Sequence, residues 1–150
     1  SEQFFWTFCD DYLELVKERA YEGDASAVTA LRIAIDVMLR LFAPVLPFAT
    51  EEVWRWTHEG SIHRASWPEL EAGEPRGLLS AVSEALIGIR RAKTDAKASQ
   101  KTAVLSAMLA GPAILAEAVG DLKAVGRIED LTLVTADEVA VSDIVLAPQE

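Results

Sequence analysis

Apolar side chains from Phe4 to about Tyr21 recur every three or four positions, which predicts a first helix. They form two neighbouring rows, so the apolar face is wider than the stripe of an ordinary surface helix. The rows are Phe4, Phe8, Tyr12 and Val16, and Phe5, Cys9, Leu13 and Ala20. Because Cys9 lies on this face, we interpret it as a small buried residue rather than a nucleophile.

A second helix is predicted from about Ser26 to Phe42, with Asp24 or Ser26 as its N-cap. Pro44 and Pro47 follow it. Each proline lacks the backbone N–H that a helix interior requires, so the pair is expected to end this helix and turn the chain.

A third helix is predicted to start at Thr50, whose hydroxyl can serve as the N-cap, and to end near Gly60. Glu51 and Glu52 would then lie in its first turn, where the helix dipole favours negative charge. Residues 60–77 contain several Gly, Pro and Ser residues, so this segment is expected to be a loop and a domain boundary.

The second half of the chain changes its period. A fourth helix is expected at about 78–98, and after Lys101 the apolar spacing approaches two. This pattern predicts a strand at 102–110, a short helix at about 112–125 and two further strands beyond it. The second half is therefore expected to hold two helices and a small three-stranded sheet.

Composition narrows the class of protein. The chain has 150 residues, of which 51% are hydrophobic, so it can bury a core, and its single cysteine cannot form an internal disulfide. These features, with no apolar run long enough for a membrane span and no signal peptide, predict a cytoplasmic protein. The first residue is not Met, which indicates a processed chain or an excised fragment.

The formal net charge is −10, and it is unevenly distributed. Residues 1–75 carry 6 basic and 14 acidic side chains, whereas residues 76–150 carry 8 and 10. An acidic chain is a poor non-specific ligand for nucleic acid, so any such binding would need a local basic patch. The segment from Arg90 to Lys101 has five basic residues against Asp95 alone, and its alternative interpretation is a solvated helix end.

Motifs of catalysis are missing. The sequence has two histidines and one cysteine, with no metal-ligand spacing, no glycine-rich phosphate loop and no nucleophile elbow. No catalytic residues and no metal site are therefore predicted, and a binding or interaction module remains.

Three stretches resemble the anticodon-binding region of valyl-tRNA synthetases, which are class I aminoacyl-tRNA synthetases. Residues 5–17 (FWTFCDDYLELVK) resemble the start of a late helix in that region, and residues 41–54 (LFAPVLPFATEEVW) are similar to the L-x-P-x-x-P-F-x-[ST]-E-E-[LVI]-W signature of the editing synthetases. Residues 60–68 (GSIHRASWP) resemble the motif that follows it there. Residues 78–150 match less specifically, through an I-R-R-x-K helix and the strand after it.

The resemblance implies a mainly α fold. Residues 1–74 would be the C-terminal part of an antiparallel helical bundle, the class I anticodon-binding domain, and residues 75–150 a small α+β subdomain with about three strands. Trp54 and Trp67 would then pack as core, whereas Trp56 stays open between core and base stacking. His63 is expected to hold the loop rather than bind a base.

The resemblance also implies a function. The chain would be the tRNA-binding, anticodon-binding fragment of a ligase that joins valine to its tRNA using ATP, and it would itself lack the catalytic and editing domains. No cofactor is expected in this chain, while ATP and magnesium are expected for the parent enzyme. The alternative is an acidic helical protein-interaction module with no nucleic-acid role.

The expected partners are the tRNA for valine and the catalytic domain of a parent chain that acts as a monomer, with no membrane. Seven basic residues are the candidate tRNA contacts: Arg90, Arg91, Lys93, Lys97, Lys101, Arg32 and Arg40. The family's preceding bundle helices are absent from this sequence. We therefore expect an apolar patch at Phe4, Phe5 and Phe8 through which the fragment could self-associate.

Overall fold

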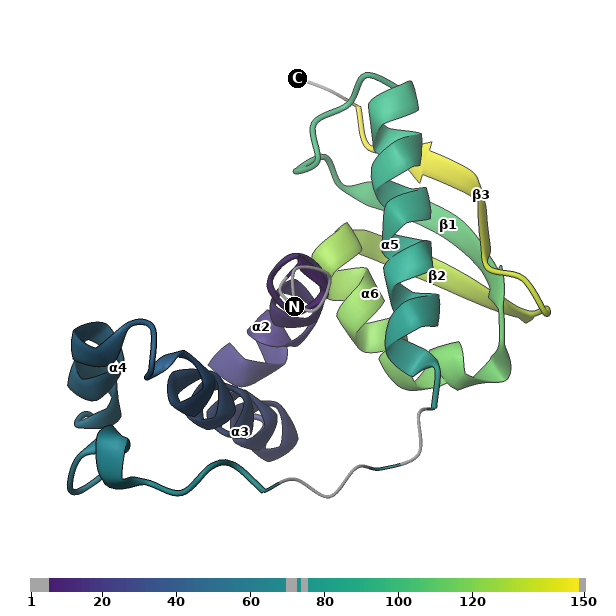
Figure 1. The fold of residues 1–150 in the computed structure, drawn as a ribbon. Coiled ribbons are helices and arrows are strands. Elements are labelled where there is room, and N and C mark those ends of the chain that lie inside the picture. The colour runs from purple at the N-terminus through teal and green to yellow at the C-terminus, as the bar shows by residue number, and fades with distance from the viewer. Residues whose placement is uncertain (1–5, 70–72, 74–75, 149–150) are drawn as a thin grey trace. The chain divides into compact units, whose positions relative to one another are not determined.

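The structure of the chain, a computed structural model, describes residues 6–69, 73 and 76–148 (Figure 1). Contacts within the chain divide it into two units, one formed by Ser1–Tyr21 and Pro75–Glu150 and the other by Glu22–Glu74. The first helix thus has its contacts with the second half of the chain. The division into domains 1–74 and 75–150 stays a prediction. None of the helices in the described residues combines the length and apolar content needed to cross a bilayer.

The second half forms a small sheet covered by helices, as its change of period predicts. Its elements are α5 (Leu78–Asp95), β1 (Val104–Gly111), a 3-10 segment (Ala113–Ala118), α6 (Val119–Gly126), β2 (Ile128–Thr135) and β3 (Ala140–Leu146). The strand order is β2-β1-β3, with β1 parallel to β2 and antiparallel to β3. The 3-10 segment and α6 supply the crossover that two parallel strands require.

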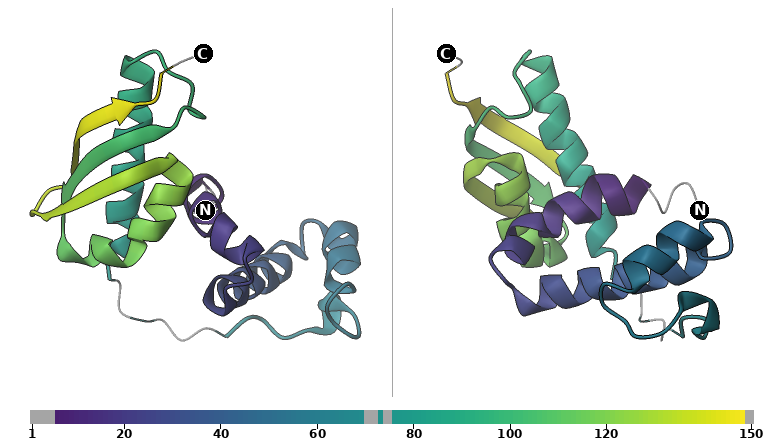
Figure 2. Two further views of the ribbon diagram at one scale, coloured as in Figure 1. Left: turned by 180° about the vertical axis from the view of Figure 1, so that it is seen from behind. Right: turned by 90° about the vertical axis from the view of Figure 1, so that its left-hand side faces the viewer.

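Both α5 and α6 lie on one face of this sheet (Figures 1 and 2). The core forms where they meet it, and its side chains are apolar and almost fully buried. Leu86 and Ile89 contribute from α5, Leu109 from β1 and Leu122 from α6. The mainly helical class and the three-stranded sheet are therefore confirmed.

The first helix is confirmed over its described residues and packs within this unit. It begins with a π-helical stretch, Thr7–Tyr12, and continues as α2 (Leu13–Tyr21). Leu15 and Val16 are its buried side chains, α2 contacts α6, and Arg19 lies 2.7 Å from Asp121. Its apolar residues thus pack at least partly against α6, a contact that sequence periodicity does not reveal.

The expected apolar patch falls partly outside the described residues, because Phe4 and Phe5 lie there. Phe8 is half-buried and stacks on Tyr12 with ring centroids 5.7 Å apart. Burial raises the pKa of Tyr12, against the charge of Arg19, which lowers it. Cys9 is half-buried rather than buried. Self-association through this patch stays a prediction.

The unit of residues 22–74 holds α3 (Ala25–Phe42), α4 (Pro47–Trp54) and a 3-10 turn (Ile62–Arg64). Asp24 caps α3, since its Oδ1 accepts a hydrogen bond of 2.8 Å from the backbone N–H of Ala27. The predicted bounds of α3 are confirmed to within a residue at each end.

The predicted start of α4 is wrong. The helix begins at Pro47, because the fixed φ of proline suits a first turn in which the missing N–H would have no partner anyway. Thr50 therefore lies inside the helix, buried, and its hydroxyl donates to the carbonyl of Leu46 at 2.9 Å instead of capping. The helix also ends at Trp54, earlier than predicted.

Glu51 ties α4 to the loop that follows it. Its Oε2 accepts hydrogen bonds from the hydroxyl of Ser61 at 2.9 Å and the backbone N–H of Ile62 at 3.0 Å. Its Oε1 accepts from Arg55 at 3.0 Å. The hydrogen bond from Ser61 is the largest of the effects that hold the pKa of Glu51 below its ordinary value.

The close approach of α5 to β3 generates a first prediction. A Cβ on Gly88 would lie 2.8 Å from Cγ2 of Val141, whereas one on Gly120 in α6 would meet nothing within 4 Å. Gly88→Ala should therefore lower the free energy of unfolding by about 1–3 kcal/mol. The matched Gly120→Ala should leave it unchanged or raise it by up to about 1 kcal/mol. Urea denaturation followed by circular dichroism measures both, and equal stabilities would show that the α5–β3 contact is not this tight.

A second prediction concerns the stability of the 61–64 turn at low pH. Because the pKa of Glu51 is lowered in the folded state, its stabilising contribution is present above the ordinary value of 4.5 and is lost as the pH falls through the folded-state value. Glu51→Gln should loosen the 61–64 turn and lower the free energy of unfolding at pH 7. The difference in this free energy between variant and wild type should shrink toward pH 3. Tryptophan fluorescence during denaturation follows this, with the exposed Glu52→Gln as the matched control. A difference that does not change with pH would contradict it.

Candidate functional site

The seven predicted contact residues fall in both units. Five belong to α5 and the segment after it, and Arg32 and Arg40 belong to α3. The two groups therefore belong to different units of the chain. Among the residues that the structure describes, no cluster of three or more His, Cys, Asp or Glu side chains is arranged to hold a metal ion.

Arg90 and Arg91 differ in how far they are already engaged. Arg90 donates to the backbone carbonyl of Asp10 at 3.1 Å, lies 3.6 Å from the Asp11 carboxylate and is 41% exposed. Arg91 is 82% exposed, and its ion pair within the described part of the chain is a long contact of 3.8 Å with Asp95 on the same helix. An exposed ion pair of this kind contributes little, so Arg91 is available to a ligand whereas Arg90 mainly joins α5 to the first helix.

Lys93 is buried, with 1% of its surface exposed, so its prediction as a tRNA contact is wrong. Its ammonium donates to the carbonyl of Gly126 at 2.8 Å and to that of Gln100 at 3.1 Å. Burial is the larger cause that lowers the pKa of Lys93, and the nearby charge of Arg127 is the second. The side chain therefore holds segments together and does not reach solvent.

Lys97 and Lys101 are exposed on the segment that links α5 to β1. Two hydrogen bonds from the Gln100 amide hold this segment against the end of α5, one to the carbonyl of Arg90 at 3.2 Å and one to the hydroxyl of Thr94 at 3.3 Å. The structure thus presents both lysines on an ordered turn.

One basic residue near this turn was not predicted. Arg127 follows α6, is exposed, and its Nη1 donates to the carbonyl of Lys101 at 3.2 Å. The two residues are 26 positions apart, so no local charge count could join them. The pairing of β1 with β2 brings them together.

Arg40 in α3 is held by three partners. Its guanidinium contacts the Asp36 carboxylate at 2.9 Å, donates to the carbonyl of Ser66 at 3.2 Å and lies 5.3 Å from the ring centroid of Trp54. These contacts fix the 61–68 loop to α3 and leave Arg40 only a quarter exposed. Arg32, two turns earlier on the same helix, is exposed.

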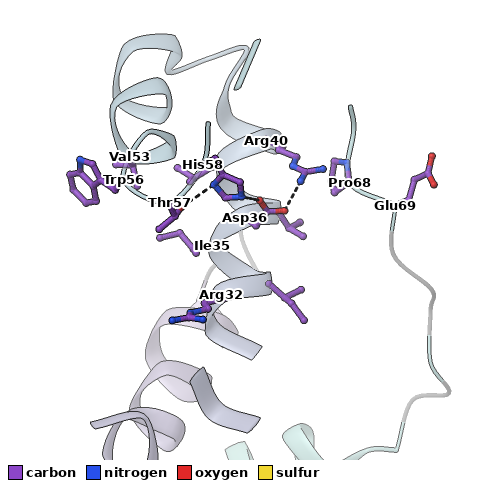
Figure 3. A pocket seen from close by; sticks show the side chains of 13 residues that line it. Arg32, Ile35, Asp36, Arg40, Val53, Trp56, Thr57, His58, Pro68 and Glu69 are labelled. Atoms are coloured by element: carbon purple, nitrogen blue, oxygen red, sulfur yellow. Dashed lines mark hydrogen bonds and ion pairs between the residues drawn. The ribbon is translucent and has the colours of Figure 1, made fainter. Parts of the chain in front are cut away.

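Arg32 and Arg40 both line an open cavity of about 760 Å³ (Figure 3). Asp36, His58 and Arg40 point toward one another in its wall. The His58 ring stacks on Trp54 with centroids 3.6 Å apart, and its Nε2 lies 3.2 Å from Asp36. The wall is thus a fixed cluster of rings and charges, and hydrogen bonds and stacking are the interactions it can offer a ligand.

The tryptophans divide differently from the prediction. Trp54 is buried at 5% exposure, as predicted, but Trp67 is 62% exposed and is not core. Trp56 lines the cavity and is 71% exposed, which leaves its indole face open for stacking. His63 lies 3.3 Å from the carbonyl of Pro47, which agrees with its expected role in holding the loop.

The position of Lys93 generates a third prediction. Lys93→Met keeps the length of the side chain but removes the donor to Gln100 and Gly126. The hydrogen bond to Gly126 is buried, and a buried carbonyl that loses its partner costs about 1–3 kcal/mol. Residues 96–103 should then exchange their amide hydrogens faster. Hydrogen-exchange mass spectrometry measures this, with Lys123→Met in α6 as the control. Unchanged protection of 96–103 would show that Lys93 does not hold this segment.

Comparison with known proteins gives this geometry a context. Residues 1–109 match the family model described as the anticodon-binding domain of tRNA ligase. The chain is 56% identical over its whole length to the valine–tRNA ligase of Leifsonia xyli subsp. xyli, of which it covers 19%. The valine–tRNA ligase of Cutibacterium acnes is 50% identical over 91% of this chain, which covers 17% of that protein. The valine–tRNA ligase of Thermobifida fusca is 45% identical over 100% of this chain, which covers 18% of that protein.

The chain thus spans less than a fifth of the length of these three relatives. The family model, in contrast, covers well over half of the chain, including α3, α4, α5 and most of β1. The chain belongs to the family of anticodon-binding domains of tRNA ligases.

Proposed function

We propose that the chain is the tRNA-binding region of a valine–tRNA ligase. The observation that supports this proposal is the family match over residues 1–109, together with similarity along the whole of this chain to proteins named valine–tRNA ligase. In this role it docks the anticodon stem-loop of the tRNA for valine. The parent protein then joins valine to that tRNA, with ATP and magnesium used by a catalytic region elsewhere in the parent, in the cytoplasm.

The exposed groups suit this partner. Arg91, Lys97 and Lys101 offer cations to backbone phosphates, and Arg32 offers another beside the α3 cavity. The open indole of Trp56 suits an unstacked loop base, because single-stranded bases are commonly held on aromatic faces. With a chain charge of −10, such contacts have to be local.

We also propose that α3 and α4 belong to an antiparallel bundle completed by other segments of the parent. Large apolar side chains on these helices are exposed, among them Phe48 at 90%, Ile33 at 50% and Phe42 at 46%. Soluble proteins seldom leave so much apolar surface on one small unit without a partner. The relatives' much greater length supplies the segments that could cover it.

A fourth prediction tests the proposed function. The chain should bind a transcript of valine tRNA, with an affinity that falls steeply between 50 and 300 mM KCl. Replacing the anticodon bases should weaken binding. Arg91→Gln should reduce the salt slope by about one unit, because one phosphate contact is lost. Fluorescence anisotropy measures these affinities, and Lys17→Gln, exposed on α2, is the control.

The alternative of a protein-interaction module makes the opposite prediction. A folded chain with no tRNA binding at 50 mM KCl, or with binding insensitive to salt, would contradict the proposed function and favour that alternative.

A further inference from the structure

Two loops of the 76–148 region are joined through one buried cation. The carbonyls that accept from the Lys93 ammonium belong to Gln100 and Gly126, at 3.1 and 2.8 Å. Each of these residues directly precedes an exposed basic residue, Lys101 in one loop and Arg127 in the other. Lys93 therefore fixes the backbone from which both of these side chains project.

Further hydrogen bonds join the same two loops directly. Arg127 Nη1 donates to the carbonyl of Lys101 at 3.2 Å, and the carbonyl of Arg127 accepts from the N–H of Val104 at 2.8 Å. The guanidinium of Arg127 and the backbone of Lys101 are thus in direct contact. The Arg127 side chain and the backbone that carries Lys101 therefore belong to one surface.

The backbone at two of these basic residues is unusual. Arg127 has φ of 52° and Lys97 has φ of 55°, in the left-handed region that residues with a Cβ seldom occupy. Such conformations persist where the surroundings hold them. At Arg127 the N–H donates to the carbonyl of Ala124 at 3.2 Å, so both the N–H and the C=O of this residue are hydrogen-bonded.

The charge of this surface is not neutralised by nearby acids. All 14 Lys and Arg residues are described, and seven of them have a carboxylate within 4 Å. The remaining seven have no such carboxylate among the described residues. They are Arg32, Arg64, Lys93, Lys97, Lys101, Lys123 and Arg127. Five of these lie between residues 93 and 127, so unpaired positive charge is concentrated there.

The lowered pKa of Lys93 agrees with this excess of positive charge. Burial is the larger cause of the lowering, and the positive charge of Arg127 is the second. Glu129 and Asp130 follow on β2 and are exposed, but neither lies within 4 Å of these cations. An anion placed between Lys101 and Arg127 would therefore meet two donors that no acid of the described residues already occupies.

We propose that Lys97, Lys101 and Arg127 form a binding site for the phosphate backbone of RNA, with Lys93 as the residue that positions it. The inference rests on the proposed function and adds to it a site that includes Arg127, far from the helix-end cluster in sequence. Because hydrogen bonds already hold the backbone of both loops, contact with successive phosphates does not require the loop backbone to be ordered on binding, a cost that would lower affinity. The site carries no base selectivity, because phosphate contacts position a nucleic acid without reading its sequence.

A fifth prediction tests the site with two double variants of equal charge change. Lys101→Gln with Arg127→Gln should weaken binding of the valine tRNA transcript about tenfold or more at 0.1 M KCl and lower the salt slope by about one to two units. Lys17→Gln with Arg76→Gln removes two exposed cations from the same unit and should change neither. Anisotropy over 50–300 mM KCl gives both quantities, and circular dichroism confirms folding.

Lys93→Met tests the positioning role, because it leaves the exposed cations unchanged in number. If Lys93 only stabilised the fold, a folded variant would keep the wild-type salt slope. We expect the slope to fall, since the loops no longer hold Lys101 and Arg127 together. Should this variant fail to fold, the surface double variant still decides the proposal.

The outcomes separate the two proposals. If wild type binds tRNA and both double variants bind as wild type does, the phosphate site is wrong and the proposed function stands. If wild type does not bind at 50 mM KCl, both are wrong. If poly-glutamate competes as well as RNA does for the wild type, the surface is a general polyanion site, and the assignment to RNA phosphate is overturned.

Discussion

The arrangement of the 76–148 region depends on the buried ammonium of Lys93. It has no carboxylate partner among the described residues, and it donates to the carbonyls of Gln100, in the loop after α5, and of Gly126, at the end of α6. The aliphatic stem of a lysine can pack with the core beneath α5 while its head reaches polar backbone at the edge. A charge buried in this way is costly to hold and more costly to leave without partners, so the two loops and the end of α5 are bound to one arrangement.

This role could have been read from the sequence. Val82, Leu86 and Ile89 lie on the buried face of α5, and Lys93 continues the same helical row. The prediction counted it with Arg90 and Arg91 because the three are neighbours in sequence. Neighbours on a helix point in different directions, so a cluster of basic residues in sequence is not a cluster in space.

Regular elements were predictable where one signal dominated. The bounds of α3 follow from a long apolar repeat and a capping Asp24, and β1 appears where the period changes. At α4 two signals competed: Thr50 resembles an N-cap, but Pro47 already provides a first-turn residue with no N–H to satisfy. The contact of Arg127 with Lys101 depends on strand pairing, which sequence periodicity does not specify.

The motif of residues 41–54, which resembles a signature of the editing synthetases, contains several residues with structural roles in this chain. Pro47 starts α4, Thr50 bonds back to Leu46, Glu51 anchors Ser61 and Ile62, and Trp54 is covered by His58. Thr50 and Trp54 are buried, and the carboxylate of Glu51 is engaged by Ser61, Ile62 and Arg55. Exposed groups occur within the motif, where Phe48 is 90% exposed, as well as beside it at Trp56 and outside it at Arg91. The buried and hydrogen-bonded residues of the motif thus serve the fold, whereas the basic residues proposed to contact RNA lie outside it. A packed corner restricts residue type much more than a solvated cation does.

Charge follows the same division of roles. Acids in this chain neutralise basic residues that have structural positions, as Asp36 does for Arg40 and Asp121 for Arg19. Seven basic residues have no carboxylate within 4 Å among the described residues, and three of them, Lys97, Lys101 and Arg127, lie on the loops after α5 and α6. A protein with a net charge of −10 can attract a polyanion only through such local segregation, because beyond a Debye length of about 8 Å at physiological salt the distant acids are largely screened. Under the proposed function, the overall acidity would oppose non-specific binding, and the local cations would determine where on the surface a phosphate backbone lies.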